Sequence, residues 1–352
     1  MHTDFKLNGH TFKDKAELLA YAKINVYAIY NFLEQWFDTS TTISVNTSGS
    51  TGEPKLIQLK KEYMVNSALA TASYFELAPN TTALLCLSSD YIAGKMMVVR
   101  ALVLGWHLDV VPPITAPLKE VIKTYDFSAM VPMQAYYSID KLSLVKKLII
   151  GGGVVSHDLI TKIKELPTKV YATYGMTETI THIAVKRLNK DAFQDATSKQ
   201  SVYELLPKIK ISKDARGCLV IQAPMVSDQT VITNDLVEVV SSTTFKWLGR
   251  YDTIINSGGI KLIPEQIEEK LSLKIKERFF VAGISDGILG EKLILVIESK
   301  KINDDLLNEV KQLTSLSKFE IPKETYFIEK FIETATKKIQ RQETLDLILK
   351  KQ

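Results

Sequence analysis

The chain has 352 residues, of which 45% are hydrophobic, and its 44 basic residues nearly balance its 40 acidic residues. The net charge of +4, with the two signs interspersed along the chain, argues against nucleic acid as a partner. This length leaves room for two or three domains with full hydrophobic cores.

The N-terminus and the apolar runs predict a soluble, cytoplasmic protein without membrane insertion. The first residues, MHTDFK, lack the apolar segment of a signal peptide. The longest apolar run, 96–106, is interrupted by Arg100 and is too short to span a bilayer. Cys86 and Cys218 lie in apolar runs, so we expect buried, reduced thiols rather than a disulfide or a metal pair.

Apolar residues in 15–37 recur at three- and four-residue spacing, which predicts one amphipathic helix. From residue 42 to about 184, short apolar runs alternate with helical patterns. Strands are predicted at 42–45, 83–87, 108–111, 129–131, 148–150 and 170–173, and helices at 61–75, 94–104, 117–123 and 157–165. This alternation is typical of an α/β domain with a largely parallel sheet.

The pattern changes after about residue 200. Polar turns separate short strands, which predicts a small antiparallel β subdomain over 200–247, with strands at 208–212, 218–223, 231–233 and 237–240. After Asp252 an α+β pattern follows, with helices at 266–271 and 304–316 and strands at 279–283 and 292–298. We therefore expect an α/β fold with a large domain over 1–251 and a smaller, mobile α+β domain over 252–352.

Residues 47–55 read TSGSTGEPK, a composition suited to holding a polyphosphate. Glycines let backbone N–H groups approach an anion, hydroxyls donate hydrogen bonds, and Lys55 adds a positive charge. The segment is not the GxxxxGK[ST] loop of common NTPases, because Pro54 stands where that loop needs glycine. A flexible Ser/Gly-rich linker is the alternative. The strand-like run that precedes the segment favours phosphate binding.

Four further clusters could carry chemistry. GGG at 151–153 ends an apolar strand, where a ring or a backbone could approach closely. YGMTE at 174–178 offers an aromatic face, a hydroxyl and a carboxylate able to hold Mg²⁺. GRYDTIINSGG at 249–259 suits a hinge that also touches a ligand. TATKKIQR at 334–341 is a basic cluster. Taken singly, each has an ordinary explanation as a turn, a packing residue or a solvated charge.

Together, the motifs TSGSTGEPK, GGG, YGMTET, TND, GRYDTIINSGG, IPEQIE and TKKIQR follow one order from about residue 45 to the end. In this order the chain resembles the adenylate-forming superfamily of acyl-CoA synthetases, peptide-synthetase adenylation domains and luciferases. The resemblance implies an acid–CoA ligase that uses a small carboxylic acid, ATP, Mg²⁺ and CoA. Acid and ATP would give an acyl-adenylate and pyrophosphate, and the CoA thiol would then take the acyl group.

The resemblance also implies an ATP site. Its residues from the first three motifs would be Thr47, Ser48, Gly49, Ser50, Thr51, Gly52, Lys55, Gly151, Gly152, Gly153, Tyr174, Gly175 and Thr177. Within this set, Tyr174 would stack on the adenine and Thr177 would contact the α-phosphate. Asp235 of the TND motif would bind the ribose together with Arg250, and Asn234 replaces the family's glycine.

Catalysis would fall to Lys338, Glu178, Thr177 and Arg250, with Glu178 as the Mg²⁺ ligand. Lys338 matches the family lysine that drives adenylation. A preorganised cation stabilises the two anions that meet when a carboxylate attacks the α-phosphorus. Lys337 stands where the family usually has glycine and is the alternative candidate.

The resemblance further implies a rotation of the C-terminal domain between the two steps. Asp252 would be the hinge residue. The rotation would present a loop that binds CoA, formed by Ser257, Gly258 and Gly259. A moving domain would explain why residues needed by one reaction lie so far apart in the sequence.

The phosphate loop starts at residue 47, whereas in the family it lies well past residue 100. Much of the family's N-terminal subdomain is therefore missing or replaced by 15–37. Short versions of this kind resemble bacterial o-succinylbenzoate–CoA ligases of menaquinone synthesis. LSSDYIAGKM at 87–96 matches the segment P-x-x-H-x-x-G that lines the family's acyl pocket, with Tyr91 in place of the histidine.

A second carboxylate on the substrate would need a buried counter-charge, because burying it alone costs several kcal/mol. Lys95 is the first candidate for that charge, and Arg100 follows along the same predicted helix. His182, just after YGMTET, is a further residue for the acyl pocket. In the alternative, Lys95 extends to solvent and Arg100 pairs elsewhere.

Three other functions stay open at this point. A ligase for a simple aryl or fatty acid would have an apolar pocket and no need of Lys95. An adenylation enzyme that loads a carrier protein would not accept free CoA. A degenerate, regulatory ATP-binding protein would release no pyrophosphate, and it would have no need of Lys338.

Overall fold

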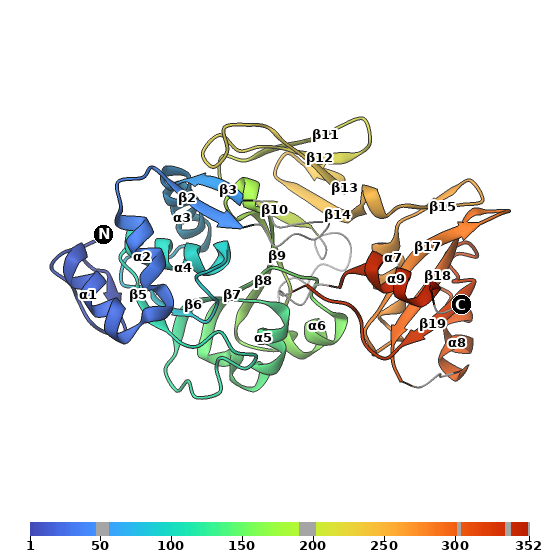
Figure 1. Ribbon diagram of the computed structural model, residues 1–352, viewed down its shortest axis with the longest axis horizontal. Coiled ribbons are helices and arrows are strands. Elements are labelled where there is room, and N and C mark those ends of the chain that lie inside the picture. The colour runs from blue at the N-terminus through green and yellow to red at the C-terminus, as the bar shows by residue number, and fades with distance from the viewer. Residues whose placement is uncertain (47–55, 190–201, 301–303, 335–338, 351–352) are drawn as a thin grey trace.

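The computed structural model describes residues 1–46, 56–189, 202–300, 304–334 and 339–350. Figure 1 shows a large region built on a 12-stranded sheet and a smaller C-terminal region built on a five-stranded sheet. The N-terminal helices, in blue, lie at the end opposite to the C-terminal region. Within the described part of the chain, no helix has the length and apolar character needed to cross a membrane.

The first half of the large sheet is parallel, as the strand–helix alternation predicts. Its strands run in the order β1 (Lys6–Leu7), β5 (His107–Val110), β4 (Thr82–Leu85), β6 (Tyr125–Met130), β7 (Val145–Ile150) and β8 (Lys169–Gly175). Neighbouring strand residues such as Ala83 and Leu84 belong to different cores, because side chains alternate across a strand. Those cores are covered by α3 (Lys61–Phe75) and α4 (Ile92–Leu104) on one face and by α5 (Pro132–Tyr137) and α6 (His157–Ile163) on the other.

The sheet then continues into an antiparallel half, so the predicted antiparallel strands hydrogen-bond directly to the parallel ones. Their order is β9 (His182–Arg187), β10 (Tyr203–Leu205), β14 (Thr244–Arg250), β13 (Val231–Ser241), β12 (Cys218–Gln222) and β11 (Lys210–Lys213). The direction reverses between β8 and β9. Gly175 is needed there, because a Cβ on it would lie 2.2 Å from the carbonyl oxygen of Thr181.

The C-terminal region forms its own sheet with two cores of its own. Its elements are β15 (Ile255–Ser257), β16 (Ile260–Leu262), α7 (Pro264–Leu271), β17 (Phe279–Asp286), β18 (Gly290–Glu298), α8 (Asp304–Lys311), β19 (Glu324–Ile328) and α9 (Arg341–Leu349). Helices α7 and α8 pack on one core and α9 on the other. Arg341 of α9 forms an ion pair with Glu268 of α7 at 2.9 Å, which ties the last helix to the first.

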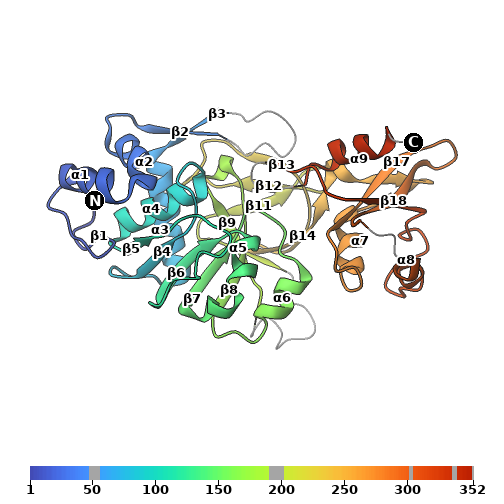
Figure 2. The same cartoon turned by 60° about the horizontal axis from the view of Figure 1, so that its bottom comes forward.

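The two strands that flank the predicted phosphate loop form a hairpin of their own, separate from the large sheet. Strand β2 (Thr42–Asn46) pairs antiparallel with β3 (Leu56–Lys60), and Asn46 faces Leu56 at the end of the register. Residues 47–55 connect these two partners and lie outside the described residues. Figure 2 shows the hairpin above the parallel strands, beside α2.

The single helix predicted over 15–37 is wrong, because the chain forms two helices. α1 (Lys15–Asn25) and α2 (Tyr27–Phe37) are separated by Val26, whose φ of −143° and ψ of 53° are not helical. Buried residues on both helices then face one core. The apolar spacing runs on through Val26, and for that reason the sequence pattern does not reveal the break.

The helix predicted over 117–123 is also wrong, since residues 117–120 form a turn. Leu118 is fully buried, so its apolar character serves the second core rather than a helix face. The side chain of Lys141 donates to the carbonyl oxygens of Lys119 and Val121. These carbonyls therefore find a partner outside any helical ladder.

Helix α4 approaches the segment before it so closely that Gly94 accepts no side chain. A Cβ at Gly94 would lie 2.1 Å from the carbonyl oxygen of Ser88, and backbone atoms cannot move aside cheaply. We expect Gly94→Ala to lower the free energy of unfolding by about 1–3 kcal/mol despite alanine's better helix propensity. Urea denaturation measures this, with Gly287→Ala as control because a Cβ there meets nothing within 4 Å. Equal stability of both variants would contradict the packing argument.

Candidate active site

Asp235, expected to bind the ribose, lies at the centre of a polar network on the antiparallel half of the sheet. It is 7% exposed and pairs in register with Arg250 of the neighbouring strand. One carboxylate oxygen accepts from the Tyr174 hydroxyl at 2.6 Å, and the other accepts from the Trp247 indole N–H at 3.0 Å. Arg250 completes the network, with Nη1 3.8 Å from Oδ1 of Asp235. Residues far apart in the sequence are thus held on one carboxylate.

Tyr174 is held on its ring as well as on its hydroxyl. Phe245 meets its ring edge-on at 5.2 Å, and Tyr203 lies 5.7 Å away. Tyr203 in turn stacks on Phe245, with ring centroids 5.4 Å apart. Burial and the neighbouring carboxylate of Asp235 raise the pKa of Tyr174, so the phenol stays protonated and donates its hydrogen bond. Stacking of adenine on Tyr174 stays a prediction.

The glycine run lies next to Tyr174 at the same edge of the sheet. Strands β7 and β8 are parallel neighbours; Gly151 directly follows β7, and Tyr174 is the second-last residue of β8. A Cβ at Gly151 would lie 2.6 Å from Oγ1 of Thr173, and Gly152 has a φ of +80°, which favours glycine. In open α/β sheets, ligands bind beyond the carboxyl ends of the strands. The expected adenine residues therefore share a site that suits a ligand.

Thr177 and Glu178 begin the short turn that leads from β8 back into β9. Residues Thr177–Thr179 form a 3₁₀ turn, and buried Thr179 fixes it by accepting a hydrogen bond from Met176 N–H at 3.1 Å. The side chain of Glu178 is exposed, and it makes no hydrogen bond to the core among the described residues. Binding of Mg²⁺ by its carboxylate stays a prediction. The described residues contain no cluster of three or more His, Cys, Asp or Glu side chains that could hold a metal ion.

Arg250 also forms hydrogen bonds with Asp252, the expected hinge residue. Nε and Nη2 of Arg250 donate to the two carboxylate oxygens of Asp252 at 3.0 and 2.8 Å. This bidentate contact lowers the pKa of Asp252. The carbonyl oxygen of Arg250 accepts from the Thr253 hydroxyl at 3.0 Å. Arg250 thus links the predicted ribose carboxylate to the start of the C-terminal region.

The expected acyl-pocket residues separate into two groups. Arg100 is 1% exposed, and its Nε donates to the hydroxyl oxygen of Thr71 at 3.3 Å. Its Nη2 is buried and has no hydrogen-bond partner, and within the described residues no carboxylate lies within ion-pair distance. Burial alone lowers the pKa of Arg100 to about 9, which still leaves the guanidinium charged at neutral pH.

His182 reaches the same hydroxyl from the other side. Its Nε2 lies 3.4 Å from Oγ1 of Thr71, whose own O–H donates to the carbonyl oxygen of Ser67 at 2.9 Å. Because that proton is already used, Nε2 must carry the hydrogen of the imidazole, and Nδ1 is an acceptor. Burial and the charge of Arg100 push the pKa of His182 well below its ordinary value, so the ring is neutral.

Lys95 does not join this group. It is 6% exposed, and its ammonium lies 4.9 Å from the centre of the Phe32 ring on α2. Lys95 and Arg100 are five positions apart on α4, which corresponds to a rotation of roughly 140° about the helix axis. The two charges therefore face different neighbours. Tyr91 precedes the helix and is 42% exposed. The structure thus brings Arg100 and His182 together and places Lys95 against the N-terminal helices.

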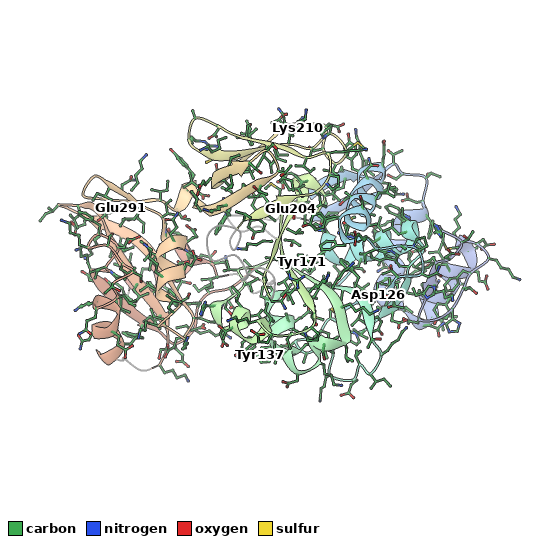
Figure 3. All side chains as sticks on the ribbon, turned by 180° about the vertical axis from the view of Figure 1, so that it is seen from behind. Asp126, Tyr137, Tyr171, Glu204, Lys210 and Glu291 are labelled. Carbon is green, nitrogen blue, oxygen red and sulfur yellow. The ribbon has the colours of Figure 1, made fainter. Side chains whose placement is uncertain are left out.

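The remaining expected residues lie elsewhere or outside the described residues. The phosphate-loop residues over 47–55, including Lys55, and the pair Lys337 and Lys338 are not described. Ser257, Gly258 and Gly259 form the turn between β15 and β16, where both glycines have positive φ. Ser257 pairs with Gly290, and Figure 3 shows the adjacent Glu291 at the end of the C-terminal region away from the large sheet.

Sequence reasoning missed Thr71, Trp247 and Arg216. Thr71 lies in the middle of α3 and Trp247 within β14, and neither belongs to a motif. Arg216 donates to the side-chain oxygen of Asn234 at 2.9 Å, which fixes the residue that replaces the family's glycine. Paired residues in these contacts are 12 to 29 apart in the sequence, so no local pattern could reveal them.

Residues 41–220 match the AMP-binding enzyme family. The chain is 24% identical over 338 residues to a 2-succinylbenzoate–CoA ligase of Bacillus cereus (strain ZK / E33L), covering 86% of this chain and 69% of that protein. A 2-succinylbenzoate–CoA ligase of Geobacillus sp. (strain WCH70) is 25% identical over 346 residues, covering 89% of this chain and 70% of that protein. The family resemblance is therefore confirmed.

Solved structures agree with this assignment. An acyl-CoA synthetase (AMP-forming)/AMP-acid ligase II-like protein of Dyadobacter fermentans is 38% identical, with a TM-score of 0.60, over 92% of this chain and 95% of that one. An O-succinylbenzoate coenzyme A synthetase of Bacillus subtilis, solved with ATP and magnesium, shares the fold at 19% identity and a TM-score of 0.73, over 86% of this chain and 69% of that one. The chain belongs to the AMP-binding enzyme family and is an ATP-dependent, AMP-forming acid–CoA ligase.

Proposed function

We propose that this ligase activates a dicarboxylic aromatic acid, 2-succinylbenzoate, and transfers it to CoA. The observation that carries the proposal is the buried guanidinium of Arg100, whose Nη2 has no hydrogen-bond partner among the described residues. Leaving a buried charge unpaired costs several kcal/mol, and a substrate carboxylate would remove that cost. Curated relatives that bear the name 2-succinylbenzoate–CoA ligase support the same acid.

The position of Arg100 explains how one carboxylate would be kept from reacting. Arg100 lies on α4 and meets Thr71 of α3 and His182 of β9, on the face of the sheet that these helices cover. The other carboxylate would extend toward Tyr174 and Thr177 at the edge of the sheet. A simple aryl or fatty acid would leave Arg100 without a partner, which makes it the weaker candidate.

The proposed adenylation begins with MgATP bound at that edge, with Asp235 on the ribose and Glu178 on the cation. A substrate carboxylate oxygen attacks the α-phosphorus, the bond to the β-phosphate breaks, and pyrophosphate leaves. Lys338 would stabilise the charge that gathers on the α-phosphate. In the second step the CoA sulfur attacks the acyl carbon, and AMP leaves with the carboxylate oxygen. Ser257, Gly258 and Gly259 would line the path of the CoA thiol.

A panel of acids tests the proposal. Pyrophosphate release with MgATP is measured for 2-succinylbenzoate and for two analogues that each lack one of its carboxylates, with benzoate and octanoate as simple acids. We expect the analogue that lacks the unreacted carboxylate to have a kcat/KM about 100-fold below that of the diacid, since one lost charge-assisted contact removes about 2–5 kcal/mol. The analogue that lacks the reacting carboxylate should release no pyrophosphate. CoA should be consumed to form the thioester. A preference for octanoate or benzoate would contradict 2-succinylbenzoate as the substrate. Pyrophosphate release without use of free CoA would favour an adenylation enzyme that loads a carrier protein.

Variants of Arg100 and Lys95 identify which of the two side chains binds the second carboxylate. We expect Arg100→Met to raise the KM for 2-succinylbenzoate about 100-fold and to leave the KM for ATP unchanged, because it removes the paired charge. Its free energy of unfolding should not fall, since the unpaired charge is itself costly. Lys95→Met is the matched control and should change the KM for the acid less than about threefold. A larger effect at Lys95, or equal effects on acid and ATP, would contradict the assignment.

A further inference from the structure

Strand β14 carries a bulge in its pairing with strand β13. Leu236 of β13 pairs with Gly249. The next residue of β13, Val237, pairs with Trp247 rather than with Leu248. Two residues of β14 therefore stand opposite one position of β13, which is the mark of a β-bulge. Gly249 borders the bulge with a φ of +149°, a backbone conformation that side-chain-bearing residues rarely adopt.

The bulge determines which side chains of β14 reach the carboxylate of Asp235. Trp247 and Arg250 are three positions apart, and in a regular strand such residues point to opposite faces of the sheet. The extra residue of the bulge offsets this alternation. Oδ1 of Asp235 accepts from the indole N–H of Trp247 at 3.0 Å and lies 3.8 Å from Nη1 of Arg250. Two side chains of one strand thus meet at one carboxylate oxygen.

The two oxygens of Asp235 keep part of their capacity to accept hydrogen bonds. A carboxylate offers about four lone-pair positions, shared equally by its two oxygens. Among the described residues, the side chain of Tyr174 donates to Oδ2 at 2.6 Å and that of Trp247 donates to Oδ1. Each oxygen therefore keeps about one position for a further donor. Two adjacent acceptors match the two adjacent hydroxyls of a ribose.

The indole of Trp247 is suited to holding a carboxylate in one orientation. Trp247 is partly buried and packs against the core that contains Val237, its partner across the two strands. Tryptophan has only two rotatable side-chain bonds, so its N–H is held at a low cost in conformational entropy. The torsion that turns an aspartate carboxylate is broad in energy, and the orientation of that group therefore depends on its donors.

We propose that Trp247 is a positioning residue for recognition of the nucleotide ribose. Its N–H fixes the plane of the Asp235 carboxylate, so that one lone-pair position of each oxygen faces the 2′- and 3′-hydroxyls together. Without this donor the carboxylate turns about its bond to Cβ, and the pair of hydroxyl contacts is lost. The inference rests on the proposed ribose role of Asp235 and goes beyond it, because Trp247 belongs to none of the motifs.

Nucleotide binding in the absence of any acid tests the role of Trp247. The Kd values of AMP and 2′-deoxyAMP are measured by calorimetric titration of the wild-type protein and of Trp247→Phe. The wild type should bind AMP about 10-fold more tightly than 2′-deoxyAMP, the size of one charge-assisted hydrogen bond. In Trp247→Phe this ratio should fall below about threefold. The two ligands differ only in the 2′-hydroxyl, so general effects of the substitution on stability cancel in the ratio.

Two further variants separate the N–H from the bulk of the indole. Trp106→Phe is the matched control and should keep the wild-type ratio, because the indole N–H of Trp106 is buried without a hydrogen-bond partner among the described residues. Trp247→3-benzothienylalanine keeps the shape of the indole and removes only its N–H, so it serves if Trp247→Phe does not fold. This variant should lose the ratio as well.

The outcomes distinguish the role of Trp247 from that of Asp235. A ratio of about 10 in both Trp247 variants would overturn the positioning role and leave the ribose role of Asp235 intact. Equal binding of the two nucleotides by the wild type would overturn the ribose role, and this inference with it. In steady-state kinetics, Trp247→Phe should raise the KM for ATP about 10-fold and change kcat and the KM for the acid less than about threefold. The titrations need no acid, so they do not depend on 2-succinylbenzoate being the substrate.

Discussion

The carboxylate of Asp235 is the constraint on which the nucleotide site depends. It accepts from Tyr174 at the end of a parallel strand and from Trp247 within an antiparallel one, and it lies near Arg250. One acceptor thus fixes residues from both halves of the sheet at the place where strand direction changes. Two of these residues also contact a second group: Tyr174 contacts the aromatic stack, and Arg250 donates to Asp252. The residues predicted to bind adenine and ribose and to form the hinge are therefore connected through one carboxylate.

In the proposed function, substrate recognition rests on a charge that has no counter-ion among the described residues. Arg100 is buried in the face formed by α3, α4 and β9, where a leucine or methionine would pack at lower cost. Chains keep such costly groups where function uses them. The low pKa of neighbouring His182 fits the same account, since a second positive charge beside Arg100 would repel it. In the proposed function, an anionic group of the substrate is the partner of this guanidinium.

Regular elements with strong local patterns were predictable from the sequence. The helix at 61–75 matches α3, and the strands at 42–45 and 148–150 fall within β2 and β7. The break at Val26 was not predictable, because the apolar spacing continues across it while the backbone leaves the helical region. Strand β3 was not predicted either, since its alternating LIQLK stretch follows directly on the polar loop. Pairing across the hairpin, rather than local propensity, determines it.

The candidate site shows the same difference between what local sequence patterns predict and what tertiary packing determines. Motifs named Tyr174, Asp235 and Arg250, and the structure brings these three together. Sequence spacing could not rank Lys95 against Arg100, because the choice depends on which helix face meets α2 and which meets α3. Thr71 carried no signal at all, although it joins Arg100 to His182. Its role follows from tertiary packing of segments 29 and 111 residues away in the sequence.

A crystal structure with 2-succinylbenzoate and a non-hydrolysable ATP analogue tests the central claim most directly. The account predicts that the unreacted carboxylate lies about 3 Å from the guanidinium of Arg100, beside the ring of His182. The other carboxylate should point toward Tyr174 and Thr177. A second carboxylate found against Lys95 or directed to solvent, with Arg100 still unpaired, would contradict the account.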